Sequence, residues 1–283
     1  MLTSHIIDEA VTRALHEDAP WGDVTSDYLI PAEAVAVAVL AARESGVMAG
    51  GQVFAAAFRL VDPAIQVELL VADGQAFTAG TQLAKVSGPA RAVLTAERVG
   101  LNFVQRMAGI ATQTAQYVAE VAGTGARVVD TRKTTPGMRN FEKYAVRCGG
   151  GHNHRYSLSD AVMAKDNHLA ILTRGGKDLT TELQRVKAEL GHTTHLEVEV
   201  DRLDQIPAVL AGGVDTIMLD NFSLEDLRAG VALIAGRCFI EASGGVNLST
   251  IRAIAETGVN IISVGALTHQ IHSLDLGLDV EIN

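Results

Sequence analysis

The sequence has few cysteine and aromatic residues and lacks any long apolar run. Its 283 residues include two Cys, one Trp and only 4% aromatic side chains. Cys148 and Cys238 are too few for a disulfide framework, so we expect two reduced thiols. No run of about 18 residues is apolar throughout, which argues against a membrane span. The N-terminus has acids early and no basic-then-apolar signal layout. We therefore expect a cytoplasmic protein.

Positive charge is also scarce, and it is concentrated in one segment. The formal net charge is −10, which argues against nucleic-acid binding because that needs a broad basic face. Between Arg132 and Lys165, however, seven Lys or Arg face only two acids, a net +5 that leaves −15 for the remainder. A local basic pocket of this kind suits a small polyanion.

The first third of the chain indicates a mixed α/β domain. Residues 5–17 have helical spacing, and 34–51 begins with strand-like residues that end in Gly turns. Residues 66–88 indicate short strands broken at Gly74, Gly80 and Gly88. A long helix follows, with Thr95 as its expected N-cap and Gly123 as its end, and we expect a break near Gly109.

The rest of the chain predicts a parallel α/β barrel. Five apolar strands are expected: "ARVVD", "HLEVEV" (195–200), "VDTIMLD" (214–220), "CFIEAS" (238–243) and "VNIISVG" (259–265). Helical stretches separate the last four, a repeat that gives parallel strands with right-handed crossovers. We assign residues 110–269 to this open, TIM-like barrel, which can have fewer than eight strands. Residues 1–109, joined by the tail 270–283, form the N-terminal α/β sandwich domain.

Polar residues follow several of these strands, where barrel enzymes place their active sites. Glu197 and Glu199 alternate with Val and therefore share one strand face, and a buried carboxylate there needs a partner. Glu199 and Asp220 lie at neighbouring strand ends. Two interpretations stay open for this pair: ligands of Mg²⁺, or acceptors for ribose hydroxyls.

A second group of strand-end residues suggests a phosphate site. Ser243, Gly244 and Gly245 precede a helix that we expect to begin near Asn247 or Leu248, and Gly265 follows the next strand. Glycine lets backbone N–H groups approach an oxyanion. A plain turn is the alternative interpretation of the Gly pair.

The basic segment carries the cations that such a site needs. Arg132 and Arg155 offer planar forks for carboxylates, whereas Lys133 and Lys165 offer point charges. His152 and His154 are either a metal pair or loop histidines without a role. Arg139 is expected at a helix start, "KDNH" (165–168) can be a polar turn, and Lys143 with Arg147 indicates a solvated helix face.

Many motifs, in order and over nearly the whole chain, resemble the quinolinate phosphoribosyltransferase family. They are "EDAPWGDVTS", "ARESGVMAGG", "TAERVGLNFVQRMAGIAT", "TRKTTPGMR", "KYAVRCGGGHNHR", "MAKDNH", "EVEVD", "IMLDN", "EASGG", "TGVNIISVGALTH" and "LDLGLD". The resemblance implies that quinolinate and phosphoribosyl pyrophosphate are converted to nicotinate mononucleotide, pyrophosphate and CO2, with Mg²⁺, in NAD biosynthesis. It also implies an N-terminal α/β sandwich, an open α/β barrel, and a homodimer or higher homo-oligomer with shared sites.

The resemblance further assigns roles to matching residues. It implies that quinolinate is held by Arg132, His154, Arg155, Lys165 and, from the partner chain, Arg98. It implies that phosphoribosyl pyrophosphate is held by Lys133, Glu199, Asp220, Ser243, Gly244, Gly265 and His269. Lys133, Glu199 and Asp220 are the expected catalytic residues, and Glu199 and Asp220 are the candidate Mg²⁺ ligands.

Three other interpretations compete with this one. In a barrel metal hydrolase, His152 and His154 would bind zinc, although "HNH" follows three glycines and no apolar run. A non-catalytic relative would bind the same ligands without turnover. A molybdate-operon homologue of the same fold would act on another substrate.

Overall fold

The structure, a computed structural model, describes residues 2–282 and divides them into two compact units. The sandwich unit comprises the described residues up to Ala115, Thr134–Gly150, and those from Leu267 onward. The barrel unit comprises Gln116–Lys133 and Gly151–Ala266. These units cut the chain at other points than the predicted boundary at 109/110, because residues 134–150 fold with the N-terminal part. Each unit is described by itself.

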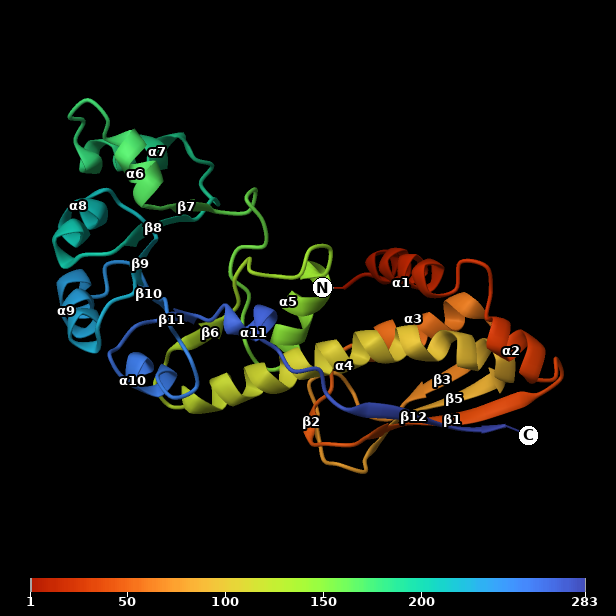
Figure 1. The fold of residues 1–283 in the computed structure, drawn as a ribbon. Helices are drawn as coiled ribbons and strands as arrows, with labels where there is room; N and C mark the ends of the chain where they lie inside the picture. Colours follow the sequence, from red (N-terminus) through yellow and green to blue (C-terminus); the bar gives the residue numbers. More distant parts are fainter. Residues whose placement is uncertain (1, 283) are drawn as a thin grey trace. The chain divides into compact units, whose positions relative to one another are not determined.

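A four-stranded antiparallel sheet organises the sandwich unit, in the order β12-β1-β5-β3. Its strands are β1 (Val35–Ala42), β3 (Gln66–Leu69), β5 (Gln82–Pro89) and β12 (Leu276–Ile282). Alternate residues of β1 are buried, as expected for a strand with one face against a core. The tail joins this sheet because β12 pairs with β1 over its whole length (Figure 1). A short pair, β2 (Gly46–Val47) and β4 (Ala76–Phe77), completes the strands of this unit.

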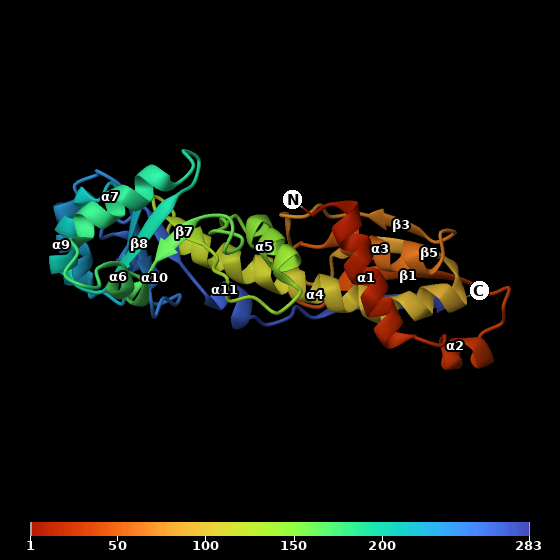
Figure 2. The same ribbon diagram turned by 90° about the horizontal axis from the view of Figure 1, so that it is seen from above.

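The sandwich unit also contains helices. They are α1 (Ser4–Asp18), α2 (Val24–Leu29), α3 (Gly51–Val61), α4 (Ala90–Glu120), α5 (Arg139–Cys148) and α11 (Ala266–His269). The predicted helix over 5–17 is confirmed as α1, which lies beside α3 (Figure 2). Phe54 and Phe58 of α3 are fully buried and meet edge to face at 4.8 Å between ring centroids. These aromatic side chains form the core under the helices.

Three predictions about α4 and its neighbouring glycines were wrong. Helix α4 begins at Ala90, runs past Thr95 and is unbroken at Gly109, where a Cβ would lie 2.1 Å from the carbonyl oxygen of His272. Gly109 therefore serves close packing of the C-terminal tail rather than a break in the helix. Gly88 lies inside β5, paired with Ala36, and does not end that strand.

Helix α5 belongs to the sandwich unit through a buried ion pair. Glu142 is 1% exposed; its Oε1 accepts from Arg106 Nη2 at 2.6 Å, and its Oε2 accepts from the Thr135 amide at 3.1 Å. Tyr144 donates to Asp73 at 2.8 Å. Lys143 is also buried, at 2% exposure, so its predicted place on a solvated face was wrong, whereas Arg147 is exposed. Helix α5 has buried side chains around most of its circumference, which the i, i+4 spacing of its cations could not reveal.

Six parallel strands form the open barrel, in the order β6-β11-β10-β9-β8-β7. They are β6 (Arg127–Val129), β7 (Val162–Ala164), β8 (Leu196–Val200), β9 (Thr216–Asp220), β10 (Phe239–Ser243) and β11 (Ile261–Ser263). The five predicted strands are confirmed, and β7 was missed because three residues are too short for a periodic signal. Strands β6 and β7 are the two edges, so the barrel is not closed.

Outer helices fix which strand residues point inward. They are α6 (Asp166–Leu172), α7 (Leu179–Glu189), η1 (Leu203–Gln205), α8 (Ile206–Ala211), α9 (Leu224–Ile234) and α10 (Ile251–Ala255). Gly230 of α9 packs against Leu219 of β9, which leaves the alternate residues Thr216, Met218 and Asp220 facing the interior. Helix α10 begins at Ile251, later than predicted, because Asn247–Thr250 forms a hydrogen-bonded turn first. Among the described residues, no helix is long and apolar enough to cross a membrane.

Candidate active site

Strand ends of the barrel unit bring predicted site residues together. Ser243 of β10 lies in register with Asp220 of β9, and Glu199 of β8 with Met218. Lys165 follows β7 and forms an ion pair with Glu199 Oε2. The residues predicted to hold quinolinate and those predicted to hold the phosphoribosyl donor therefore meet at Lys165 and Glu199.

A cavity of about 370 Å³ lies beside this pair. Four carboxylates line it, Asp166, Glu199, Asp201 and Asp220, together with Arg202 and apolar residues of α6 and α7. Such an acidic lining suits a hard divalent cation or sugar hydroxyls better than bare phosphate groups. Asp220 also accepts from the Asn221 side-chain amide at 2.6 Å.

The turn at Gly244 has a shape that only glycine allows. Gly244 has φ +94° and Asn221, against it, has φ +57°. A Cβ on Gly244 would lie 2.1 Å from Asn221 Oδ1, and the Asn221 amide donates to the Ser243 carbonyl at 2.9 Å. The turns after β9 and β10 are thus locked to each other.

The basic loop is anchored by a buried acid that the sequence reasoning missed. Asp130, 0% exposed, follows β6; its Oδ1 accepts from the His154 amide at 2.8 Å and its Oδ2 from the Asn153 side chain at 2.6 Å. His152 forms a parallel bridge with Val129. The signal available was an acid directly after an apolar strand, "VVD". This anchor places the loop that carries Arg155 along the edge of the barrel.

Arg132 and Arg155 lie close enough to repel each other. Burial lowers the pKa of Arg155, and the neighbouring charge of Arg132 lowers it further. The Arg155 guanidinium donates to the Ala161 carbonyl at 3.0 Å and lies 3.7 Å from Met163 Sδ of β7. Two neighbouring cations of this kind suit an anion with more than one charge.

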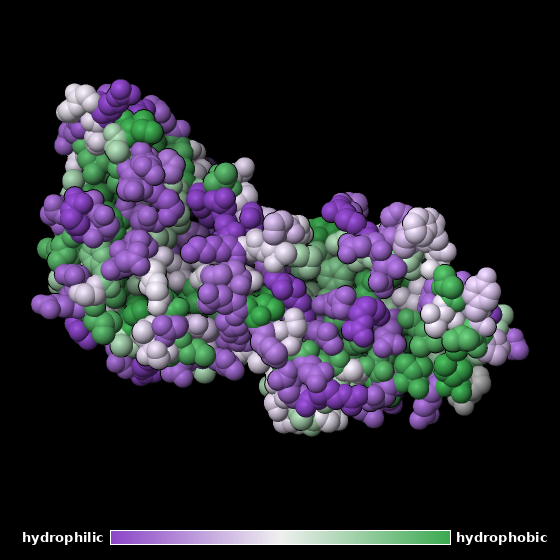
Figure 3. Space-filling view, in the orientation of Figure 1, coloured by the Kyte–Doolittle hydropathy of each residue, from purple (hydrophilic) through white to green (hydrophobic). Residues whose placement is uncertain are grey.

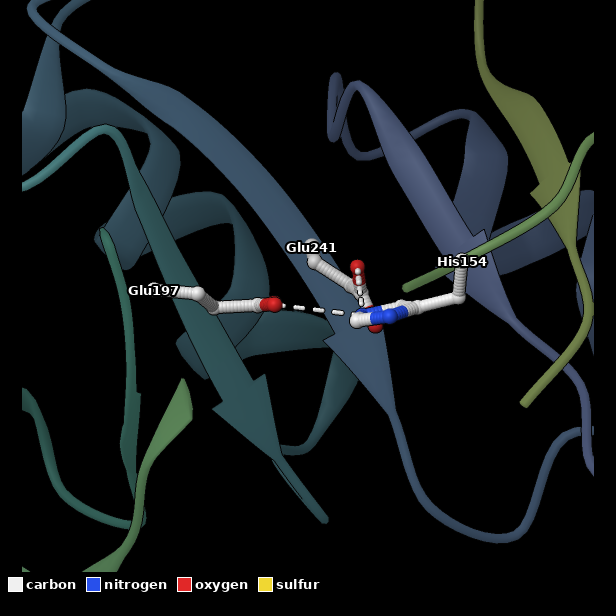
Figure 4. Close-up of side chains that lie close together, drawn as sticks. All are labelled: His154, Glu197 and Glu241. Carbon is white, nitrogen blue, oxygen red and sulfur yellow. Dashed lines mark ion pairs between the residues drawn. The ribbon is translucent and has the colours of Figure 1, made fainter. Parts of the chain in front are cut away.

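His154 meets two buried acids, of which the sequence reasoning missed Glu241. Its Nε2 lies 3.1 Å from Glu197 Oε2 and 3.4 Å from Glu241 Oε2 (Figure 4). Burial lowers the pKa of His154, whereas hydrogen bonds to both carboxylates and their charges raise it. The sequence signal was again an acid inside an apolar strand, "CFIEAS".

The remaining predicted residues lie at edges or in the other unit. Lys133 is exposed, and its amide donates to Thr131 Oγ1 at 3.0 Å; Gly265 directly precedes α11. Arg98 lies exposed on α4, and exposed His269 ends α11 in the sandwich unit. The contacts of all these residues with ligands stay predictions.

Comparison with known proteins places this geometry in a family. Residues 23–108 match the model of the N-terminal domain of quinolinate phosphoribosyl transferase, and residues 110–279 match that of its C-terminal domain. The nicotinate-nucleotide pyrophosphorylase [carboxylating] of Mycobacterium leprae is 41% identical over 96% of both chains. The probable enzyme of the same name from Bacillus subtilis is 39% identical over 94% of this chain and 91% of the relative.

Solved structures agree. NadC from Streptococcus pyogenes superposes with a TM-score of 0.94 at 40% identity, covering 100% of this chain and 98% of that one. The nicotinate-nucleotide pyrophosphorylase from Francisella tularensis gives a TM-score of 0.92 at 37% identity, covering 99% and 98%. Sequence and fold together show that this chain belongs to the quinolinate phosphoribosyltransferase family.

Proposed function

We infer that this chain is a phosphoribosyltransferase that makes nicotinate mononucleotide, pyrophosphate and CO2 from quinolinate and phosphoribosyl pyrophosphate, in NAD biosynthesis. Family membership over nearly the whole chain supports this reaction. The observation that carries it is the pair of neighbouring cations Arg132 and Arg155, in the same unit as the Lys165–Glu199 pair. Quinolinate is a dianion and the donor a polyanion, so bringing them together requires local cations.

We propose that the protein acts mainly by positioning and by charge neutralisation. As the C1–O bond to pyrophosphate breaks, C1 of the ribose gains oxocarbenium character, and the pyridine nitrogen of quinolinate forms the new bond to C1. The positive charge of the pyridinium then stabilises the electron pair left on the ring carbon when the adjacent C–CO2 bond breaks and CO2 leaves. A proton from water replaces the lost carboxylate. No activated nucleophile of the protein is required, and Arg132, Arg155 and Lys165 hold the two carboxylates.

Magnesium fits the acidic cavity. Glu199 and Asp220 lie among four carboxylates, the hard oxygen donors that Mg²⁺ prefers. When bound there, Mg²⁺ would supply charge neutralisation for the departing pyrophosphate. The alternative, that these carboxylates bind ribose hydroxyls, predicts no metal affinity without substrate. Titration with Mn²⁺, followed by its electron paramagnetic resonance signal, separates the two in wild type and Asp220→Asn.

We propose a homodimer in which Arg98 enters the partner's site. The region around α2 exposes large apolar side chains, among them Trp21 at 95% and Tyr28 at 85%, and apolar surface gathers there in Figure 3. Asp23, at the start of α2, accepts from Thr95, one helical turn before Arg98 on α4. A partner covering α2 would therefore lie next to Arg98.

The direct test incubates pure protein with quinolinate, phosphoribosyl pyrophosphate and Mg²⁺, with nicotinate as the control substrate. We expect nicotinate mononucleotide from quinolinate only. Arg132→Ala should lose turnover while remaining folded. Arg98→Ala mixed with Arg132→Ala chains should regain activity in a verified heterodimer, because one of its two sites has neither substitution. Normal turnover by Arg132→Ala would remove its assigned role, and no recovery would exclude shared sites. The cytoplasmic location stays a prediction.

A further inference from the structure

Two acids on alternate strands of the open barrel converge on one histidine. Glu197 lies on β8 in register with Thr216 of β9, and Glu241 lies on β10 in register with Met218, the next inward-facing residue of β9. In barrels, inward side chains from alternate strands share one interior layer. Here that layer holds two carboxylates where closed barrels usually hold branched aliphatic residues. Figure 4 shows both pointing at the imidazole of His154, which comes from the basic loop.

This arrangement is unfavourable for stability alone. Glu197 is 4% exposed and Glu241 is 2% exposed, and within residues 2–282 neither Oε1 atom has a hydrogen-bond partner. Burial raises the pKa of Glu197; the hydrogen bond to His154 opposes this rise, and Glu241 adds to it. Buried polar clusters of this kind can often be replaced by apolar residues without loss of stability. Their presence therefore calls for a role in the site.

The contacts of His154 fix the position of its proton. The amide of Arg155 donates to Nδ1 at 2.6 Å, so Nδ1 must offer a lone pair. The ring proton then lies on Nε2, where both carboxylates accept it. The two carboxylates favour a second ring proton, but on Nδ1 that proton would face the N–H of Arg155 at 2.6 Å. Two N–H groups cannot face each other at that distance, so the ring carries one proton, on Nε2.

The same proton position argues against a metal ion held by these three residues. One oxygen of each carboxylate and Nε2 lie within 4.8 Å of one another, a spacing that a metal ion could bridge. A histidine that ligates through Nε2 must be deprotonated there, and its remaining proton then lies on Nδ1. The donated hydrogen bond from the Arg155 amide excludes that proton.

We propose that Glu197 and Glu241 are positioning residues that hold His154 in the Nε2–H form, so that Nδ1 fixes the Arg155 amide and orients Arg155 toward quinolinate. This inference rests on the proposed function for the identity of the anion. The loop is clamped at two successive amides: Asp130 accepts from His154 N–H, and His154 Nδ1 accepts from Arg155 N–H. Side chains of Glu197 and Glu241 thus act on the substrate through the backbone at Arg155.

The first test observes the proton itself. Protein labelled with ¹⁵N in its histidine rings is examined by NMR in the absence of substrates, and the His154 signals are identified by their loss in His154→Asn. We expect one protonated nitrogen, Nε2, and one unprotonated nitrogen, Nδ1, at neutral pH. Two protonated nitrogens, a proton on Nδ1, or stoichiometric zinc on the purified protein would each overturn the proposal.

The second test compares matched double variants. Glu197→Leu with Glu241→Leu removes both acceptors at similar volume, whereas Glu197→Gln with Glu241→Gln keeps a carbonyl oxygen at each position. We expect the Leu variant to raise the KM for quinolinate by about tenfold or more, with the KM for phosphoribosyl pyrophosphate changed less than about twofold. The Gln variant should stay within about threefold of wild type for both substrates.

Each outcome of the second test has a meaning. An unchanged KM for quinolinate in a folded Leu variant, or equal losses for both substrates, would overturn the positioning role. A Gln variant as impaired as the Leu variant would show that charge, not the proton position, matters, and would also overturn it. Should wild type fail to turn over quinolinate, the proposed function falls, and the His154 assignment is then decided by the NMR spectrum.

Discussion

Replacing Gly244 with Ala tests whether the turns after β9 and β10 are locked together. The new Cβ would lie 2.1 Å from Asn221 Oδ1 and 2.6 Å from its Cγ, at a backbone φ of +94°. Strained backbone at a non-glycine residue costs about 1–3 kcal/mol. The forced overlap adds about 1–3 kcal/mol, because Asn221 must move and weaken its hydrogen bond to Asp220. We therefore expect a total loss of about 2–6 kcal/mol.

Two glycines of the same unit supply matched controls. Gly245 has φ +61° and Gly213 has φ +76°, and an added Cβ at either would meet no atom within 4 Å. Gly245→Ala and Gly213→Ala therefore carry the backbone strain without the overlap and should cost about 1–3 kcal/mol. Urea unfolding of the three variants measures the difference. Adding Asn221→Gly to Gly244→Ala should restore about 1 kcal/mol or more, since the blocking side chain is gone.

The refuting result is specific. If Gly244→Ala unfolds at the same urea concentration as Gly245→Ala, or if Asn221→Gly restores nothing, the two turns are not interlocked. A stable Gly244→Ala with unchanged KM for phosphoribosyl pyrophosphate would also count against the predicted place of Gly244 in the donor site.

Three further predictions concern the sandwich unit. Glu142→Gln should cost about 2–4 kcal/mol in urea unfolding because Arg106 loses a buried partner, and a change below about 0.5 kcal/mol would contradict that pairing. Hydrogen bonds from Ser26 lower the pKa of Asp23 in the folded protein. The contribution of ionised Asp23 to the free energy of unfolding is therefore present above the unfolded pKa of about 3.9 and is lost as pH falls through the lower folded pKa. Asp23→Asn should thus be less stable than wild type at pH 7, by under about 1 kcal/mol, and equal to it near pH 2; an equal difference at both pH values would refute this. Burial and the charge of Asp73 raise the pKa of Cys148 to about 12, so at pH 8 only about one thiol in 10⁴ is ionised. A disulfide reagent should therefore label Cys148 slowly until the protein unfolds. Rapid labelling of the native protein would contradict the raised pKa.

Local patterns were sufficient to predict the barrel strands. "HLEVEV", "TIMLD" and "FIEAS" combine β-branched residues with clear boundaries, and their spacing predicts parallel order without tertiary information. The helix of residues 5–17 carries its own apolar stripe, as confirmed by α1. Where elements are short or depend on distant contacts, as in β7 and at the start of α10, the local signal fails.

The site required contacts that no local pattern reports. Gly109 looked like a helix breaker because the tail that packs on it is far away in sequence. The strand-end rule correctly brought Glu199, Asp220 and Ser243 to one edge, but it did not include Lys165, which follows the missed strand β7. It could not say that Glu241 would reach past β9 to His154, since that depends on which interior layer each side chain occupies.

The gap between the two edge strands of the barrel has a thermodynamic consequence. The segment that crosses it starts with His152 bridged to β6 and continues through Arg155, whose guanidinium binds the Ala161 carbonyl just before β7. Irregular backbone, and not hydrogen bonds between strands, therefore connects the two edges β6 and β7 of the barrel. A ligand bound to Arg155 would reinforce the link between β6 and β7. The barrel unit should therefore become more resistant to unfolding as the fraction of protein with bound ligand rises.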